Sequence, residues 1–222
     1  VLKTHFLQII SHEIRTPLNG LVGATQLFKE NLPHESSKKY ADLFSMLEIS
    51  IERLEKFLLL AERITILKAG KYKIERKTID LESFIADIIA SLQDKICKKN
   101  ITIITNINTN KLRADTELLK ISVSEILDNA IKYTQNKGVI TITSTTTATG
   151  ISIVVQDNGQ GFSEFALNHV YEMFSTFDNL NTDSVGLDLA LVKLIMDVHQ
   201  GVISIRNNST QGAWVELFFK NI

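Results

Sequence analysis

The clearest pattern in this 222-residue chain is a run of apolar positions spaced alternately by four and three. Its members are Tyr40, Phe44, Leu47, Ile51, Leu54, Leu58 and Ala61, and Leu43 and Phe57 widen the stripe. This spacing predicts a long helix with a heptad seam, capped at Ser36 or Ser37 and ended by Ala69-Gly70-Lys71. Another apolar helical pattern, from about Leu2 to Asn31, precedes it. Pro17 should kink that helix, because proline lacks an N–H donor.

Two such helices joined by the short break at residues 31–35 form a hairpin. A lone hairpin cannot bury both of its apolar faces. Pairing with a second copy into a homodimeric four-helix bundle is the economical solution. We therefore predict a dimerisation domain over residues 1–68, with the homodimer formed through this segment.

Beyond Gly70 the pattern changes to short alternating runs mixed with helical stretches. Strands are predicted at residues 72–77, 101–107, 139–147, 151–156, 203–206 and 214–219, and helices at 81–98, 118–133 and 188–199. This mixture predicts an α+β sandwich, a sheet covered by helices on one face. We place a linker at residues 69–80 and a second domain at residues 81–222.

Composition narrows the functional classes. The chain is 44% hydrophobic with a net charge of −1, and it shows no basic stripe of the kind that binds nucleic acid. Cys97 is the single cysteine, which excludes an intrachain disulfide and favours a reducing cytosol. No apolar run approaches the ~20 residues of a membrane span, so we expect this fragment to make no membrane contact. It begins inside a helical pattern, which suggests a piece of a longer protein.

The first candidate for chemistry is His12, which helix geometry places beside the apolar stripe. Glu13 is adjacent, and Thr16 lies one turn on. A carboxylate that takes the imidazole proton keeps the other ring nitrogen nucleophilic, so this pair could accept a phosphoryl group. A lone histidine on a helix surface is more often without a chemical role, and the assignment depends on further motifs.

Two later segments carry such motifs. Glu125, Asn129 and Lys132 share one helix face; a carboxamide suits Mg²⁺, and a lysine neutralises phosphate charge. Asp157 follows an apolar strand, where its carboxylate could accept a hydrogen bond from an adenine amino group. Gly159 and Gly161 would let the backbone approach the ring closely. Alone, each pattern fits a solvated helix face or a plain turn.

Taken in order, these segments resemble sensor histidine kinases of two-component signalling. Residues 6–19 resemble the H-box and residues 125–134 the N-box, while residues 157–162, 173–177 and 186–192 resemble the G1, F and G2 boxes of the GHKL (Bergerat) ATP-binding fold. The resemblance covers essentially the whole chain. It implies a cytoplasmic kinase core belonging to a larger, membrane-tethered bacterial sensor.

The resemblance also assigns roles. It implies that His12 is the phosphoacceptor and Glu13 the general base, and that Thr16 helps to position water for dephosphorylating a partner. ATP and Mg²⁺ are the implied cofactors, with Asn129 as the metal ligand, and the implied partner is a response-regulator receiver domain. The nucleotide-binding residues would be Asn129, Lys132, Tyr133, Asp157, Gly159, Gly161, Phe162, Gly186 and Leu187. The remaining histidines, at 5, 34, 169 and 199, we interpret as structural.

The chain departs from the family pattern at three points. Ser184 and Asp188 replace two glycines of the G2 box, and Asp188 places a carboxylate where phosphates would approach, unless it simply caps its helix. Residues 172–191 hold the ATP lid that the resemblance implies; this lid contains Glu172, Asp178, Asp183 and Asp188 but no Lys or Arg, although a positive clamp is expected there. Glu125 stands where the family has Asn; in related ATPases such as DNA gyrase a glutamate there activates water, but we favour a tolerated substitution.

Three functions remain open at this stage. The leading hypothesis is a protein-histidine kinase that autophosphorylates His12 from Mg-ATP and transfers the phosphoryl group to a response-regulator aspartate. The altered lid motivates the alternative of a degenerate kinase-fold module that acts by dimerisation and partner binding. Glu125 motivates a standalone GHKL ATPase, against which the H-box argues.

Overall fold

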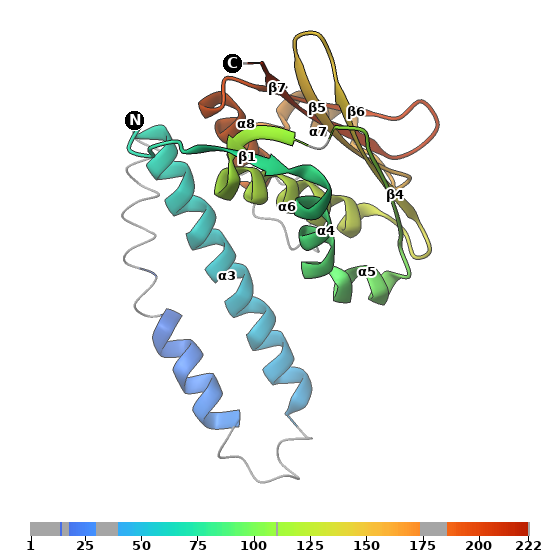
Figure 1. Cartoon of the computed structure of the whole chain (residues 1–222). Helices are drawn as coiled ribbons and strands as arrows, with labels where there is room; N and C mark the ends of the chain where they lie inside the picture. The colour runs from blue at the N-terminus through green and yellow to red at the C-terminus, as the bar shows by residue number, and fades with distance from the viewer. Residues whose placement is uncertain (1–13, 15–17, 30–39, 110, 174–185, 222) are drawn as a thin grey trace.

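A computed structural model describes residues 14, 18–29, 40–109, 111–173 and 186–221. Its longest element is helix α3, Ala41–Lys68, beside which runs the helical segment 18–29 (Figure 1). The Lys29 ammonium donates to the Glu48 carboxylate across the two helices at 2.5 Å. The predicted hairpin is thus present in its described part. The expected kink at Pro17 and the cap at Ser36 or Ser37 lie outside the described residues.

Helix α3 ends where the sequence predicts, with Ala69 as C-cap and Gly70 at φ +64°, a left-handed conformation that glycine adopts without steric cost. The two halves of the helix differ in burial. Its first half exposes apolar side chains, among them Leu43, Met46 and Leu47. Its second half is buried against the rest of the protein, at Leu60, Ala61, Ile64 and Leu67.

The remaining residues form seven strands and five further helices within the described part of the chain. The helices are α4 (Leu81–Ser91), α5 (Gln93–Lys99), α6 (Thr116–Tyr133), α7 (Glu164–His169) and α8 (Asp188–Val198). The strands are β1 (Arg76–Asp80), β2 (Thr102–Ile107), β3 (Lys111–Asp115), β4 (Val139–Thr146), β5 (Gly150–Asp157), β6 (Val202–Asn207) and β7 (Ala213–Lys220).

The main sheet has five strands in the order β2-β4-β5-β7-β6. Strands β2 and β4 are parallel, and the other neighbours are antiparallel. Strands β4 and β5, both predicted from the sequence, pair as an antiparallel hairpin, with Ile142 opposite Val155. Helices α4, α6 and α8 lie on one face of this sheet (Figure 1). Strands β1 and β3 form a separate antiparallel pair.

The core lies between the sheet and these helices. Alternate residues of the central strands point toward it, and Ile140, Ile142 and Ile153 are at most 1% exposed. Leu119 and Leu127 of α6 pack against them. Because the period-2 pattern of the strands meets the helical stripe of α6 at one surface, a single sheet-on-helix core results. The predicted α+β sandwich is confirmed.

The fold differs from the predicted elements in three places. Helix 81–98 is broken at Leu92 (φ −105°, ψ 7°) into α4 and α5, and the break turns Ile96 into the core. The strand predicted at 72–77 begins instead at Arg76, since it pairs with β3, a strand the pattern did not predict. Strand β1 therefore falls inside the segment predicted as linker. Helix α7 was also missed; the Ser163 side chain caps it by accepting from Ala166 N.

Candidate functional site

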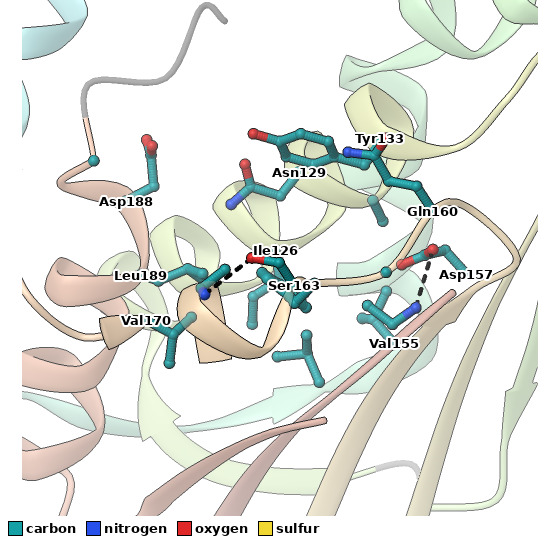
Figure 2. A pocket seen from close by; sticks show the side chains of 17 residues that line it. Ile126, Asn129, Tyr133, Val155, Asp157, Gln160, Ser163, Val170, Asp188 and Leu189 are labelled. Carbon is teal, nitrogen blue, oxygen red and sulfur yellow. Dashed lines mark hydrogen bonds between the residues drawn. The ribbon is translucent and has the colours of Figure 1, made fainter. Parts of the chain in front are cut away.

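A cavity of about 440 Å³ lies between α6, the end of β5, α7 and the start of α8 (Figure 2). Six of the sequence-predicted cofactor residues line it: Asn129, Tyr133, Asp157, Gly161, Phe162 and Gly186. Asp157 and Asp188 mark opposite ends of the cavity, with Asn129 and Tyr133 between them. We refer to these as the Asp157 end and the Asp188 end.

The Asp157 end is built around one buried carboxylate. Asp157 Oδ1 accepts hydrogen bonds from Gly159 N at 2.8 Å and from Ala213 N at 3.2 Å. Burial raises the pKa of Asp157, and these two backbone bonds oppose that rise. Since both bonds go to Oδ1, the other oxygen remains able to accept a donor from a ligand in the cavity.

The loop after β5 needs its glycines for packing. A Cβ on Gly159 would lie 2.4 Å from the Tyr133 carbonyl oxygen, which is closer than any side chain tolerates. Gly161 has φ +71° and lies against Asn207. Asn207 holds the loop by accepting from Phe162 N and donating to Phe162 O, each at 2.7 Å. Nothing in the local sequence pattern pointed to Asn207, because it lies 45 residues further along.

Helix α6 supplies the wall between the two ends. The Asp115 carboxylate caps it by accepting from Glu117 N and Leu118 N, both at 3.1 Å, which fixes the phase of the helix. Asn129 and Tyr133, four residues apart, consequently face the cavity. Lys132 does not line it; its ammonium lies 5.2 Å from the centre of the Tyr133 ring.

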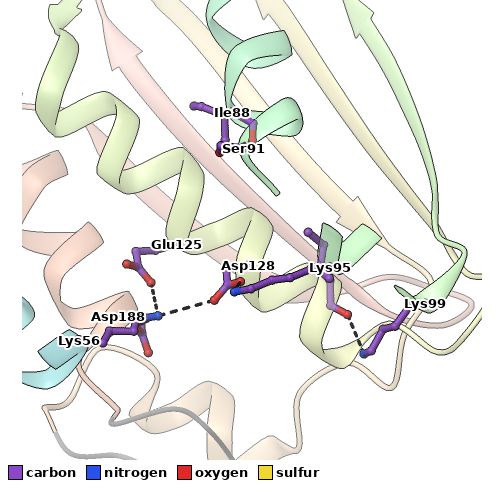
Figure 3. A network of polar contacts seen from close by, with 9 residues as sticks. Lys56, Ile88, Ser91, Lys95, Lys99, Glu125, Asp128 and Asp188 are labelled. Atoms are coloured by element: carbon purple, nitrogen blue, oxygen red, sulfur yellow. Dashed lines mark hydrogen bonds and ion pairs between the residues drawn. The ribbon is translucent and has the colours of Figure 1, made fainter. Parts of the chain in front are cut away.

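Asp188 belongs to an ion-pair network beside the cavity (Figure 3). Lys56 of α3 lies 2.9 Å from Asp188 Oδ1, 2.8 Å from Glu125 Oε2 and 3.7 Å from Asp128 Oδ2. Leu187 is the N-cap of α8, and no side chain caps this described helix, so the alternative in which Asp188 simply caps it is wrong. Instead the Asp188 carboxylate, in a residue that is 5% exposed, pairs with a cation from another helix.

The pKa values of this network follow from burial and charge. Burial alone would lower the pKa of Lys56, but the carboxylates of Glu125 and Asp188 hold it above its ordinary value. Burial raises the pKa of Glu125 to about 7, with Lys56 opposing the rise and Asp188 adding to it. Glu125 does not line the cavity and is engaged by Lys56. This placement does not favour a role for Glu125 in activating water.

Comparison with known protein families matches two segments of the chain. Residues 2–58 match the His Kinase A (phospho-acceptor) domain. Residues 114–221 match the family described as histidine kinase-, DNA gyrase B- and HSP90-like ATPase. The chain belongs to the sensor histidine kinases of two-component signalling. The family and fold predicted from the sequence motifs are thereby confirmed.

Individual sensor kinases align along the whole chain. The heme sensor protein HssS of Staphylococcus saprophyticus is 27% identical over 221 residues, covering 100% of this chain and 47% of the relative. The structure of full-length ShkA in complex with AMPPNP superposes with a TM-score of 0.74 at 23% identity, covering 98% and 46% of the two chains. The complex of ThkA with the response regulator TrrA gives 0.67 at 23%, covering 98% and 61%. The chain therefore spans about half the length of the curated relatives it matches.

Several predicted residues of this histidine kinase chain stand apart from the cavity. Gly159 donates its N–H to Asp157, and Leu187 is buried against α3, but neither residue lines the cavity. His12, Glu13, Thr16 and the lid residues Asp178, Asp183 and Ser184 lie outside the described residues. The roles that the family resemblance gives all of these residues remain predictions.

Two of the histidines predicted to be structural are described. His199 is buried; its Nε2 accepts from Asp115 N at 3.1 Å and its Nδ1 donates to Ile195 O at 2.9 Å. Burial lowers the pKa of His199, although the Ile195 bond and the charge of Asp115 oppose this. His169 Nδ1 bonds Phe165 O at 2.8 Å. His5 and His34 lie outside the described residues.

Two further properties of the described residues concern metal-ligand clusters and helices that could cross a membrane. Among the residues it covers, no three His, Cys, Asp or Glu side chains are grouped so that they could hold a metal ion. None of its helices combines the length and the apolarity that a membrane crossing requires.

Proposed function

We propose that this chain is the kinase core of its sensor: it autophosphorylates His12 from Mg-ATP and passes the phosphoryl group to an aspartate of a response regulator. The Asp157-centred cavity is the observation that carries this proposal. A buried carboxylate, held on one oxygen by two backbone N–H groups, offers its other oxygen to the exocyclic amino group of adenine. The matched phospho-acceptor domain, which contains His12, precedes this cavity in the same chain.

The residues that line the cavity fit a Mg-nucleotide. Mg²⁺ keeps several waters and binds through one or two protein oxygens together with substrate phosphates, and the Asn129 carboxamide offers one such oxygen between the two ends. Bound there, Mg-ATP supplies the γ-phosphoryl group. ShkA, which shares the fold, was solved in complex with AMPPNP. Tyr133, Gly161, Phe162 and Gly186 line the remaining wall, and we retain Lys132, Gly159 and Leu187 as predicted supporting residues.

The transfer itself belongs to His12 and Glu13. One ring nitrogen of His12 attacks the γ-phosphorus with its lone pair and forms an N–P bond, while the P–O bond to ADP breaks and its electron pair leaves on the ADP oxygen. Glu13 takes the proton from the other ring nitrogen, which keeps the imidazole neutral as the bond forms. Thr16 would support the reverse reaction, dephosphorylation of the partner.

The partners follow from the phospho-acceptor domain. We propose a homodimer through residues 1–68, because the first half of α3 exposes Leu43 and Leu47, which belong to the predicted heptad seam. A Leu47→Glu variant should then sediment as a monomer at concentrations where the wild type is a dimer. We propose a response-regulator receiver domain as the phosphoryl acceptor; ThkA was solved in complex with the regulator TrrA. From the same family membership we propose that this chain is part of a larger sensor and that its kinase core is cytoplasmic.

The proposal is tested by incubating the chain with Mg²⁺ and γ-labelled ATP and following acid-labile, base-stable label. We expect label in the wild type and none in His12→Gln. A thermal shift with Mg-ATP measures nucleotide binding independently, because a ligand of the folded state raises its melting temperature. Nucleotide binding without label would instead support a regulatory module built on the kinase fold.

A further inference from the structure

The network at the Asp188 end joins two domains through one side chain. Lys56 comes from α3, in the helical hairpin, whereas Glu125 and Asp188 come from α6 and α8 of the ATP-binding domain (Figure 3). Its Nζ lies within 2.9 Å of a carboxylate oxygen on each. Lys95 also pairs with Asp128, but Lys95 belongs to α5 of the same domain as its partner. Lys56 is therefore the member of this network that depends on how the two domains are docked.

Apolar packing supports the ion pair. Leu60 and Ile64, one and two turns beyond Lys56 on α3, are at most 1% exposed. They pack in one cluster with Leu187 and Leu191 at the start of α8. The Lys56 side chain keeps about a third of its surface exposed (33%), so its charge is only partly screened by water. The contact is thus a packed interface with its charges at one edge, unlike an isolated surface salt bridge, which contributes little.

The charges of Lys56, Glu125 and Asp188 are best explained as one group. Glu125 and Asp188 are both acidic at positions where the family pattern has neutral Asn and Gly, and Lys56 contacts both. Asp188 lines the cavity at the N-terminus of α8, where phosphates are expected to approach. Residues 172–191 contribute no Lys or Arg to balance it. Lys56 supplies the neutralising charge from the other domain.

The position of Lys56 along the hairpin adds a reason for such docking. In the hairpin that the sequence predicts, with its turn near Pro33, Lys56 lies 23 residues after the turn and His12 lies 21 before it. At a rise of about 1.5 Å per residue, both positions fall roughly 30–35 Å from the turn. A contact at Lys56 therefore holds the Asp188 end at the level predicted for the phosphoacceptor.

We propose that Lys56 is a positioning residue for phosphoryl transfer: by pairing with Asp188 and Glu125 it docks the Asp188 end of the nucleotide cavity on the phospho-acceptor domain and neutralises Asp188 in the path of the phosphates. This inference rests on the proposed function. It assigns to the helical hairpin the cation that the lid segment lacks. It also makes the two acidic departures from the family pattern functional parts of one interdomain contact.

The test compares wild type with Lys56→Met, which keeps the length of the side chain and removes its charge, and with Lys56→Arg, which keeps the charge. Lys193→Met is the matched control, because Lys193 pairs with Asp197 within α8 and does not line the cavity. Both the labelling rate of His12 at saturating Mg-ATP and the nucleotide dissociation constant are measured. A misplacement of about 1 Å can cost on the order of 10²-fold in rate, so we expect the rate of Lys56→Met to fall by roughly 10- to 100-fold.

Lys56→Arg should recover most of that rate, and Lys193→Met should match the wild type. A Lys56→Met rate equal to that of the wild type would overturn the proposal, and a higher rate would show that the contact restrains the kinase. If the wild type itself takes no label, it is the proposed function that fails.

A zero-length carbodiimide cross-linker, which joins amines to carboxylates already in contact, tests the docking in the unaltered protein. A mass-spectrometric cross-link from Lys56 to Asp188 or Glu125 is expected, and its absence would contradict the docked contact.

Discussion

The two ends of the nucleotide cavity are built in different ways. At the Asp157 end, a carboxylate is fixed by backbone N–H groups of Gly159 and Ala213, all within one sheet and its following loop. At the Asp188 end, the carboxylate is paired with Lys56, a long side chain from another domain. The first arrangement exists whenever the ATP-binding domain is folded. The second exists only while that domain is docked on α3.

This difference separates the end of the cavity that binds nucleotide in every domain arrangement from the end that depends on docking. A site made of backbone bonds within one core is as stable as the core and gives the same nucleotide contact in every domain arrangement. An end completed by an interdomain ion pair responds to any movement of the hairpin, because the pair is lost when the helices separate. Signals that reach the hairpin can therefore alter the Asp188 end while leaving the Asp157 end intact.

The largest expected effect comes from disturbing the backbone of the Asp157 end. A Cβ on Gly212 would lie 1.9 Å from the Asp157 carbonyl oxygen, and Gly212 has φ +92°, so Gly212→Ala combines overlap with strain. We expect the free energy of unfolding of the ATP-binding domain to fall by about 4 kcal/mol, measured by urea denaturation. Gly70→Ala is the control: Gly70 has φ +64° but open space around its Cβ, and should cost only about 1 kcal/mol. Equal losses in both variants would contradict this account.

The next effect is on nucleotide affinity at the same end. Asp157→Asn retains the size of the side chain but places an amide where a carboxylate accepts two backbone N–H bonds and, in our proposal, the adenine amino group. Losing a hydrogen bond to a charged group and leaving buried donors unmatched costs about 3 kcal/mol, or roughly 100-fold in the dissociation constant for ATP. Calorimetric titration checks this. Asp197→Asn, which alters an exposed pair on α8, should bind ATP like the wild type.

The same contrast explains what the sequence predicts well. Asp157 and Gly161 belong to one short segment, and Asn129 and Tyr133 lie four apart on α6. These local motifs, matched to the family pattern, predict the nucleotide site, and the four residues line one cavity. Strands β4 and β5 were predicted for the same reason. Strand β3 was missed because its identity as a strand depends on pairing with β1, more than 30 residues earlier. The break at Leu92 was missed because it is set by the packing of Ile96.

Sequence patterns could not predict the ion-pair partner of Asp188. The acidic departures Glu125 and Asp188 are visible in the sequence, but Lys56 lies 69 residues before the first of them, on a helix whose pattern predicts only a seam. A lysine on a predicted helix face carries no signal for a distant partner. Asn207, which holds the loop at the other end, was missed for the same reason.

Weakening the apolar part of the docking should affect the Asp188 end alone. Ile64 is fully buried between α3 and the start of α8, and Ile64→Ala removes part of that packing. We expect the docked arrangement to lose about 2 kcal/mol, so the yield of the carbodiimide cross-link from Lys56 to Asp188 falls, while nucleotide affinity changes little. Leu59→Ala, at an exposed position of the same helix outside the predicted seam, should leave the yield unchanged. Equal cross-linking in the two variants would show that the packing does not support the ion pair.

The smallest effect expected is a change in the pH dependence of stability. Burial raises the pKa of Glu125 to about 7, against the opposing charge of Lys56. The folded chain therefore keeps a proton on Glu125 at pH values where the unfolded chain has lost it, so this residue makes stability fall as pH rises from about 4.5 to 7. Glu125→Gln cannot ionise. Between pH 5 and 7 its unfolding free energy, measured by denaturant titration, should therefore fall by about 1 kcal/mol less than that of the wild type. If both proteins show the same slope, Glu125 is ionised throughout this range, and Lys56 sits between two full negative charges. The Asp188 end would then be a permanent ion-pair network whose strength depends on docking but not on pH.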